Sequence, residues 1–395
     1  MAFIPSSATT ASTATLRQRT LAKMEHEAVA RECLPVLLEL HASGALSSET
    51  LYDELAAAAP TAADVDGVAV SECHEVQRLW GGMGAVLELT LRTATGAAAP
   101  LILKRVELPA LGCTSVGDRR KEASYVVEQA FYERGHAAAL RALGADVPLP
   151  LLTRREGRTM TTAMTKLSGA AAGGLGEAQC QAVMRWMARL HARYWGAARA
   201  DAAVAGGGLQ AQGSYWYLET RRDEWDRMSG RGWEGRLKRA AAGIDAALKA
   251  ASMQGVVHGD AKAANMLFRP DGEVQMYDFQ YVGKAPPAKD LAYVVMCAAT
   301  TAEEGATRAL LRYYLAQLSP LLEAQGDAPP PFEALWDAYL LSVADLGRWM
   351  AGWGWWGNRG MDEIIQGVLD RLDGGQALAS EEQYADAARR EFGHI

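Results

Sequence analysis

Hydrophobic and polar positions follow a strand-like pattern in the first half of the chain and a helical pattern in the second. Between residues 68 and 165, short runs rich in Val, Leu and Ile are separated by glycine clusters, which is typical of antiparallel strands. A helix with apolar residues at helical spacing is predicted at 118–143, before Gly144. The strands are predicted at Val68–Leu79, Val86–Thr93, Leu101–Val106, Val147–Leu152 and Thr159–Met164.

Beyond Gly173 the pattern is mainly helical, with an apolar stripe through Val183, Met187, Leu190 and Tyr194. The order of strands, one helix, strands and then many helices predicts an α+β fold. We expect two lobes: a small antiparallel-sheet N-lobe over residues 68–165 and a larger, mainly helical C-lobe over residues 166–395.

The first 67 residues are expected to lie outside these lobes. Residues 1–20 are rich in Ala, Ser and Thr, and the chain has no acidic residue before Glu25. This composition predicts either a disordered tail or an organelle-targeting segment. Residues 21–67 are predicted to form a helical extension, in which Pro35 interrupts the first helix and opens a second.

Composition narrows the class of protein. Of the 395 residues, 49% are hydrophobic and 22% are charged, which is typical of a globular protein. The net charge of −7 argues against a nucleic-acid partner. No apolar run is long enough to cross a bilayer, so no integral membrane contact is expected. Five scattered cysteines without a C-x-x-C pair exclude a disulfide scaffold and favour a reducing compartment. We expect a cytoplasmic protein, with import through a transit peptide as the alternative.

The densest chemical signal follows the apolar run Val256-Val257. It reads His258-x-Asp260-x-x-x-x-Asn265, and Asp278 stands thirteen residues further on, after another apolar run. Phosphoryl transfer from ATP needs such a set. One carboxylate orients or deprotonates the acceptor hydroxyl, and an amide and a second carboxylate hold Mg²⁺ at the phosphates. Any one of these residues alone would fit an ordinary loop; the spacing of all three favours a kinase.

Three longer stretches resemble the aminoglycoside phosphotransferase and choline kinase superfamily, and within it the ecdysteroid kinase-like (CHK-type) proteins. Asp278-Phe279-Gln280, then Pro286-Pro287 and Asp290-Leu291-Ala292-Tyr293, is similar to that group's DFQ…P…DL-Y stretch. Residues 128–132 and 190–195 are similar to two of its helices. The resemblance implies a bilobal, protein-kinase-like fold and an ATP- and Mg²⁺-dependent enzyme. The similarity covers residues 68–314.

The nucleotide-binding parts follow from this resemblance. Lys104, on the third predicted strand, is expected to bind the phosphates and to be held by Glu128, with Glu122 as a competitor. Gly82 and Gly84 join the first two strands, where they form either a phosphate-covering loop or a tight hairpin. Adenine is expected to bind backbone near Met164.

Further residues are assigned around this core. His258 and Asp290 are expected to support the catalytic loop. Lys262 departs from the family pattern and is either a catalytic cation or a surface lysine. Late tryptophans are either packing or one side of an acceptor pocket for an ammonium-bearing alcohol or a flat apolar alcohol. The residues named for this pocket are Trp216, Trp349, Trp353 and Trp355.

The function expected is phosphorylation of a hydroxyl group on a small molecule, with Asp260 as the base. A protein kinase is less consistent with the sequence because only twelve positions separate Asp278 from Asp290, too few for a peptide-docking segment. A catalytically inactive nucleotide-binding scaffold is the remaining alternative. Acceptor identity and oligomeric state are not encoded in any recognisable motif.

Overall fold

The computed structural model describes residues 9–46, 50–58, 62–110, 112–358 and 360–395. The chain forms two compact units, each described here by itself. The first contains the described residues up to 118 together with 148–168, and the second contains 119–147 and 169–395. The sequence placed all of 68–165 in one lobe, whereas residues 119–147 group with the larger unit. The α+β class is confirmed: one unit is built on an antiparallel sheet and the other is mainly helical.

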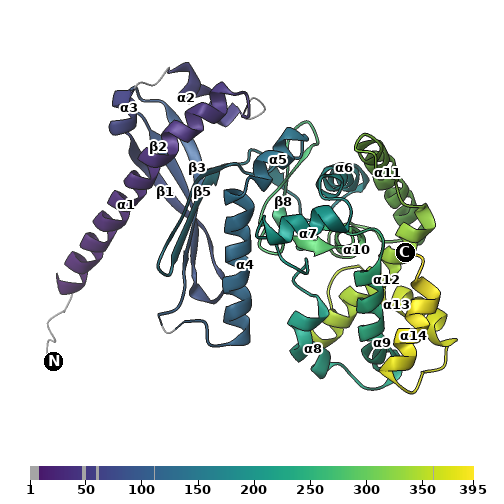
Figure 1. Ribbon diagram of the computed structural model, residues 1–395. Coiled ribbons are helices and arrows are strands. Elements are labelled where there is room, and N and C mark those ends of the chain that lie inside the picture. Colours follow the sequence, from purple (N-terminus) through teal and green to yellow (C-terminus); the bar gives the residue numbers. More distant parts are fainter. Residues whose placement is uncertain (1–8, 47–49, 59–61, 111, 359) are drawn as a thin grey trace, which may run out of the picture. The chain divides into compact units, whose positions relative to one another are not determined.

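A five-stranded antiparallel sheet forms the centre of the first unit (Figure 1). Its strand order is β1-β2-β3-β5-β4, so every neighbouring pair except β3-β5 is a hairpin. All five strands were predicted, with boundaries shifted by a few residues. Their bounds are β1 Ala69–Arg78, β2 Gly84–Arg92, β3 Ala98–Glu107, β4 Pro150–Glu156 and β5 Thr159–Thr165.

Helix α1 (Thr9–Ala42) packs on this sheet. The prediction that Pro35 would divide the helix is wrong, because Pro35 lies inside it. Proline removes one backbone hydrogen bond. Val29, Cys33 and Leu37 are buried at i, i+4 and i+8, so apolar packing on both sides of the proline offsets that loss. The tail expected at residues 1–20 lies outside the described residues as far as residue 8, and residues 9–20 belong to α1.

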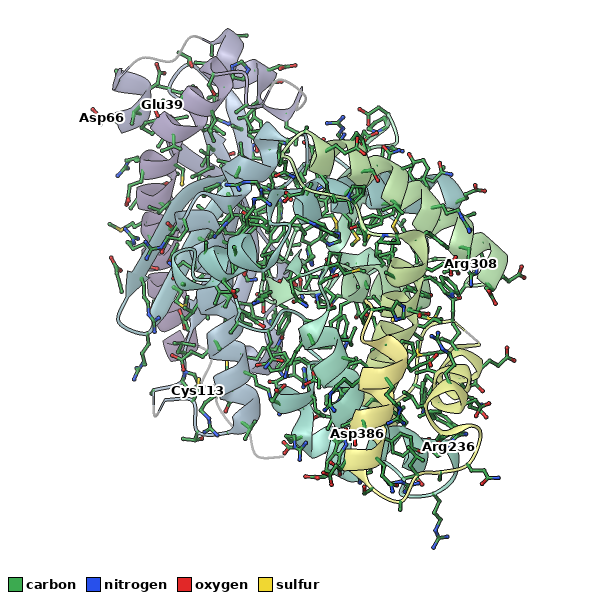
Figure 2. All side chains as sticks on the ribbon, turned by 45° about the vertical axis from the view of Figure 1, so that its right-hand side comes forward. Glu39, Asp66, Cys113, Arg236, Arg308 and Asp386 are labelled. Atoms are coloured by element: carbon green, nitrogen blue, oxygen red, sulfur yellow. The ribbon has the colours of Figure 1, made fainter. Side chains whose placement is uncertain are left out.

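The first unit also contains short helical elements beside the sheet. They are a 3-10 turn at Thr50–Tyr52, α2 (Asp53–Ala57) and α3 (Ala62–Asp66). Glu39 and Asp66 point into solvent from α1 and α3 (Figure 2).

The helix predicted at 118–143 is two helices, α4 (Val116–Glu133) and α5 (His136–Ala142). The break lies at Gly135, whose φ of +77° is outside the helical range. His136 then begins α5, and its Nδ1 lies 2.6 Å from the hydroxyl of Tyr194. A glycine inside the periodic pattern therefore marks a turn that periodicity alone does not reveal.

The second unit is built mainly of helices. Its α12 runs through the centre and contacts α8, α9, α10 and α13. Arg236 of α9, labelled in Figure 2, pairs with Asp370 of α13 at 2.6 Å. Besides α5 and the part of α4 from residue 119 on, its helices are α6 (Glu177–Arg193), α7 (Ala197–Ala205), α8 (Arg222–Arg227), α9 (Gly232–Ala250), α10 (Ala288–Cys297), α11 (Glu304–Glu323), α12 (Phe332–Trp353), α13 (Met361–Asp373) and α14 (Glu381–Phe392).

Two small sheets complete the second unit. One has the order β6-β8-β9 and the other pairs β7 with β10. Among the described residues, no helix has the length and apolar character needed to cross a membrane. All five cysteines are free thiols. The strands are β6 (Ala170–Ala171), β7 (Gly255–Val257), β8 (Met266–Phe268), β9 (Val274–Met276) and β10 (Gly283–Ala285).

Candidate active site

The β8–β9 hairpin brings together polar residues that are thirteen positions apart. Met266 pairs with Met276, so Asn265, just before β8, lies opposite the residues that follow β9. The backbone N–H of Tyr277 donates to the carbonyl oxygen of Asn265 at 3.2 Å. Asp278 is the next residue. A short antiparallel hairpin therefore places the amide of Asn265 and the carboxylate of Asp278 at one end.

Asp260 follows β7 and is 3% exposed. Its Oδ2 accepts hydrogen bonds from Nζ of Lys262 at 2.7 Å and from Nδ2 of Asn265 at 3.2 Å. Its Oδ1 is buried and has no hydrogen-bond partner among the described residues. Burial raises the pKa of this carboxyl; the charge of Lys262 opposes that rise and the charge of Asp278 adds to it. One carboxylate oxygen is thus fixed while the other is available for a ligand.

Asn265 and Asp278 provide the hard oxygen atoms that Mg²⁺ prefers. Nδ2 of Asn265 also donates to the carbonyl oxygen of Asp260 at 2.8 Å, which leaves its Oδ1 outside these bonds. Magnesium keeps several water ligands, so an amide and a carboxylate suffice from a protein when phosphates supply the rest. No cluster of three or more His, Cys, Asp or Glu side chains suited to a metal occurs in the part of the chain that the structure describes. The donor set fits a phosphate-bound magnesium ion.

The backbone around these residues is strained. Asp278 has a φ of +68° and Ser214 a φ of +78°, and they are the non-glycine residues with positive φ in the described chain. The backbone N–H of Ser214 donates to the carbonyl of Tyr281, three residues beyond Asp278. Such conformations persist only where the surrounding structure enforces them, and they cluster at functional sites.

Asp290 of α10 holds the loop that carries Asp260. Its fully buried carboxylate accepts the backbone N–H of His258 at 2.6 Å and that of Gly259 at 3.0 Å. Nε2 of His191 lies 3.3 Å from the same carboxylate. His258 is buried too, with Nε2 3.1 Å from the carbonyl of Tyr277. Asp290 thus bonds to the backbone of the loop that carries Asp260, and His258 lies against the backbone just before Asp278.

Helix α4 is attached to the segment that follows Asp278. The hydroxyl of Ser124 donates to Oε1 of Gln280 at 3.0 Å, and the rings of Phe131 and Phe279 stack at 3.9 Å. Burial raises the pKa of Tyr132 well above its usual range, and the charges of Glu128 and Asp278 contribute to the increase. The charges of Glu128 and Asp278 thus both act on Tyr132, and all three residues belong to the second unit.

The nucleotide residues expected on the sheet lie in the first unit. Lys104 is 8% exposed and sits between Val86 and Thr162. Arg105 lies on the opposite face, where it pairs with Glu25 of α1 at 2.6 Å. Because side chains alternate along a strand, Lys104 faces away from α1.

The glycines and Met164 have different surroundings. A Cβ on Gly84 would lie 2.0 Å from the carbonyl oxygen of Arg105, so close strand pairing requires this glycine. Gly82 has open space around its Cα. Met164 pairs with Ile102 on one side and with Pro150 on the other, inside the sheet. Gly84 is thus explained by close strand pairing, and Gly82 by its φ of +71°, in the left-handed region that favours glycine.

The four tryptophans named for an acceptor pocket differ in burial. Trp216 and Trp349 are buried, and Tyr215 contacts both, with ring centroids 5.3 and 4.7 Å away. Trp353 and Trp355 are 55% and 46% exposed at the end of α12 and beyond it. The buried and exposed members are linked, because the rings of Trp349 and Trp353 stack with centroids 6.2 Å apart.

Two residues near the site were not identified from the sequence. Tyr281 lies three positions after Asp278, and Arg221 places its guanidinium 5.6 Å from the ring centroids of both Tyr215 and Trp349. The only signal was the enrichment of residues 215–233 in Tyr, Trp and Arg, which does not specify which side chain lies near Asp260.

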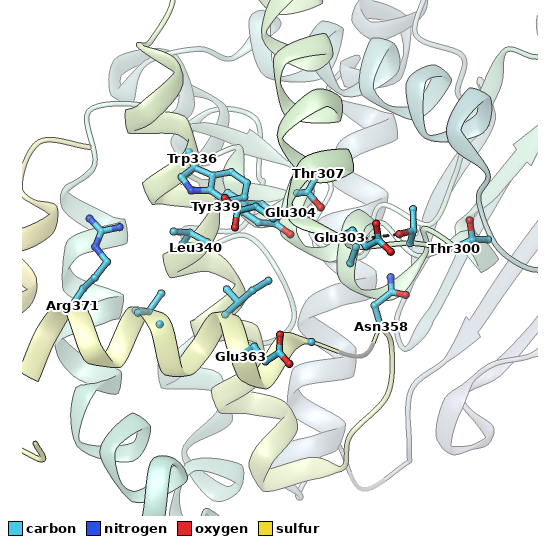
Figure 3. Close-up of a pocket in the computed structure, with 16 residues that line it drawn as sticks. Thr300, Glu303, Glu304, Thr307, Trp336, Tyr339, Leu340, Asn358, Glu363 and Arg371 are labelled. Carbon is cyan, nitrogen blue, oxygen red and sulfur yellow. Dashed lines mark hydrogen bonds between the residues drawn. The ribbon is translucent and has the colours of Figure 1, made fainter. Parts of the chain in front are cut away.

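A separate hollow of about 700 Å³ lies among the α10–α11 loop and helices α11, α12 and α13 (Figure 3). Trp336, Tyr339 and Leu340 project into it from α12, with Glu363 and Arg371 on α13. None of its lining residues belongs to the loop of Asp260 or to the β8–β9 hairpin. The polar groups described above are not part of this hollow.

Comparison with known proteins identifies the family. Residues 75–328 match the phosphotransferase enzyme family (APH), and the chain belongs to this family. Among curated proteins, none matches the chain.

Several solved structures are similar in part. A macrolide 2′-phosphotransferase from Brachybacterium faecium is 16% identical, with 82% of this chain and 98% of that chain covered and a TM-score of 0.43. A choline kinase from Streptococcus pneumoniae is 13% identical, with 76% of this chain and 92% of that chain covered and a TM-score of 0.43. An ethanolamine kinase from Plasmodium vivax is 11% identical, with 82% of this chain and 81% of that chain covered and a TM-score of 0.42.

Proposed function

We propose that this phosphotransferase transfers the γ-phosphoryl group of ATP to a hydroxyl group of a small molecule, with Asp260 as the catalytic base. The observation that carries the proposal is the state of the Asp260 carboxylate: Lys262 and Asn265 hold Oδ2, while the buried Oδ1 has no partner among the described residues. A base must present one oxygen to the hydroxyl proton in a fixed direction, and this arrangement suits that task.

The reaction forms one P–O bond and breaks another. The acceptor oxygen attacks the γ-phosphorus as the bond from that phosphorus to the β–γ bridging oxygen breaks, and ADP leaves. The hydroxyl proton passes to Oδ1 of Asp260. Lys262, whose ammonium lies beside the same carboxylate, offsets negative charge that develops on the transferred group.

Asn265 and Asp278 would hold Mg²⁺. When bound, the ion neutralises charge on the β- and γ-phosphates. We assign Lys104 and Glu128 to nucleotide binding, Gly82 and Gly84 to the loop covering the phosphates, and backbone near Met164 to adenine. His258 and Asp290 support the loop of Asp260.

A small acceptor is favoured over a protein. Only twelve positions separate Asp278 from Asp290, and they contain β10 and then the start of α10, with no peptide-docking segment. Within the family, we propose membership of the ecdysteroid kinase-like branch, which the DFQ sequence at 278–280 and Tyr293 resemble.

The test is an ADP-release screen with Mg·ATP over amino alcohols, aminoglycosides, sugars and sterols, followed by ³¹P NMR of the product. Asp260→Asn should lower kcat by roughly 10²–10⁴-fold and leave Mg·ATP binding within a few fold. Asp271→Asn is the matched control, because Asp271 is an exposed residue of the β8–β9 hairpin and should not matter. Near wild-type turnover by Asp260→Asn would refute the assignment.

A further inference from the structure

Four aromatic side chains from four parts of the second unit converge beside the loop of Asp260. Tyr215 is at the centre: its ring centroid lies 5.4 Å from that of Tyr281, 5.9 Å from that of Tyr293 and 4.7 Å from that of Trp349. The hydroxyls of Tyr215 and Tyr293 are 2.8 Å apart. We call these four residues the aromatic cluster.

The aromatic cluster is within electrostatic range of the catalytic carboxylate. Burial raises the pKa of Tyr281 to about 12, and the charges of Asp260 and Asp278 add to the rise. Burial is also the main cause of the raised pKa values of Tyr215 and Tyr293, with Asp260 the next cause for each. An acceptor molecule whose hydroxyl group reaches Asp260 from this side would therefore contact these aromatic rings.

Two cations contact the aromatic cluster. Arg221 lies over the rings of Tyr215 and Trp349, and its Nε donates to the carbonyl oxygen of Tyr215 at 2.6 Å. Burial is the largest cause that lowers the pKa of Arg221, which agrees with a partly desolvated guanidinium. Nζ of Lys121 donates to the hydroxyl of Tyr281 at 3.0 Å.

Two further carboxylates of this region are paired with cations. Glu224 is 2% exposed, and its Oε1 has Arg221, Arg227 and Arg120 at 3.4, 3.7 and 3.9 Å, while its buried Oε2 has no hydrogen-bond partner among the described residues. Asp345 is bound by Lys289 at 2.9 Å and by Arg348 at 2.8 Å. An ammonium group entering here would meet the cations Arg221 and Lys121, and the three arginines beside Glu224 outnumber its single negative charge.

We propose that the acceptor is a planar, non-cationic hydroxy compound that stacks on the aromatic cluster, and that Arg221 selects against acceptors bearing an ammonium group. This inference rests on the proposed function and decides between the two acceptor classes that the tryptophan pattern left open. Aromatic faces accept a flat ring, and Arg221 favours a neutral or acidic substituent over a basic one.

Three compounds with the same ring and hydroxyl test this: 4-(hydroxymethyl)benzamide, 4-(hydroxymethyl)benzoate and 4-(hydroxymethyl)benzylamine. Their affinities are measured by calorimetry with the full chain in the presence of Mg·ADP. The amide or the acid should bind at least about tenfold more tightly than the amine. A smaller ratio, tighter binding of the amine, or no binding by any of the three would overturn the inference.

A variant locates the origin of the selectivity. Arg221→Gln should reduce the ratio of affinities several-fold. Arg227→Gln, which removes the same charge from a more exposed neighbour of Glu224, should leave it unchanged. An unchanged ratio in a folded Arg221→Gln protein would refute the role of Arg221. If no acceptor yields ADP but the affinity order holds, the proposed function fails and the binding inference stands.

Discussion

The ammonium of Lys262 lies 2.7 Å from Oδ2 of Asp260, on a carboxylate whose other oxygen has no partner among the described residues. Burial lowers the pKa of Lys262, but the charges of Asp260 and Asp278 outweigh burial and raise it overall. Lys262 is therefore charged at neutral pH and pulls the pKa of Asp260 down against burial.

Removing this charge should change the pH dependence of the reaction. In Lys262→Met the pKa of Asp260 rises further, and because the base must be ionised, the acidic limb of kcat/KM should move to higher pH. The measurement is kcat/KM between pH 5 and 9. Lys284→Met is the control: it removes a lysine of β10 that pairs with Asp201 of α7, and it should keep the wild-type pH profile. An unmoved limb in Lys262→Met would contradict the assignment of Asp260 as the base.

Replacement of Asp278 should separate metal binding from backbone conformation. Asp278→Asn keeps a side chain that tolerates positive φ, so it should remain folded while Mg·ATP affinity falls by roughly 10–100-fold. Asp278→Ala should lose the same affinity and also about 1–2 kcal/mol of stability. Calorimetric titration of ATP with and without Mg²⁺ measures the first effect, and thermal unfolding the second. Equal Mg²⁺ dependence in wild type and Asp278→Asn would exclude Asp278 as a metal ligand.

Two glycines form a matched pair for testing whether the loop that carries Asp260 needs a glycine. Gly259 and Gly272 have φ of +80° and +84°, so alanine is strained at both. A Cβ on Gly259 would lie 2.2 Å from the carbonyl oxygen of Tyr281, whereas Gly272 has open space. Gly272→Ala should cost about 1–2 kcal/mol, and Gly259→Ala more, with loss of activity. Urea unfolding with a kinase assay measures both, and equal effects would mean that the loop can move away from Tyr281.

Asp290 should contribute more to stability than an exposed acid does. Asp290→Asn weakens the bonds from the backbone N–H groups of His258 and Gly259, and about 2–4 kcal/mol should be lost. Asp327→Asn, which breaks a part-exposed pair with Arg199, should cost at most about 1 kcal/mol. Denaturant unfolding measures both. Comparable losses would show that the loop does not depend on Asp290.

The sequence predicted the parts of the site whose geometry is local. Asn265 and Asp278 are joined by one hairpin, and Asp260 is five positions before Asn265, so spacing and apolar flanks are enough to bring them together. The five strands of the sheet were predicted for the same reason, because alternating runs and glycine turns act over a few residues.

Features that depend on distant packing could not be predicted. Tyr215 and Arg221 reach the Asp260 side only because residues 213–214 bond to the backbone of Tyr281 and Lys284, some seventy positions away. Pro35 stays inside a helix because the sheet beneath it buries both flanking turns. Trp349 is buried and Trp353, one turn later, is exposed, because α12 ends there.

The attachment of α4 has a consequence for control of the enzyme. Hydrogen bonds from Lys121 and Ser124, together with the stacking of Phe131, fix this helix at three points along one side to Tyr281, Gln280 and Phe279. An outward movement of α4 would break these contacts with the segment that follows Asp278. We expect an enzyme that is always switched on, whose output follows the supply of its two substrates.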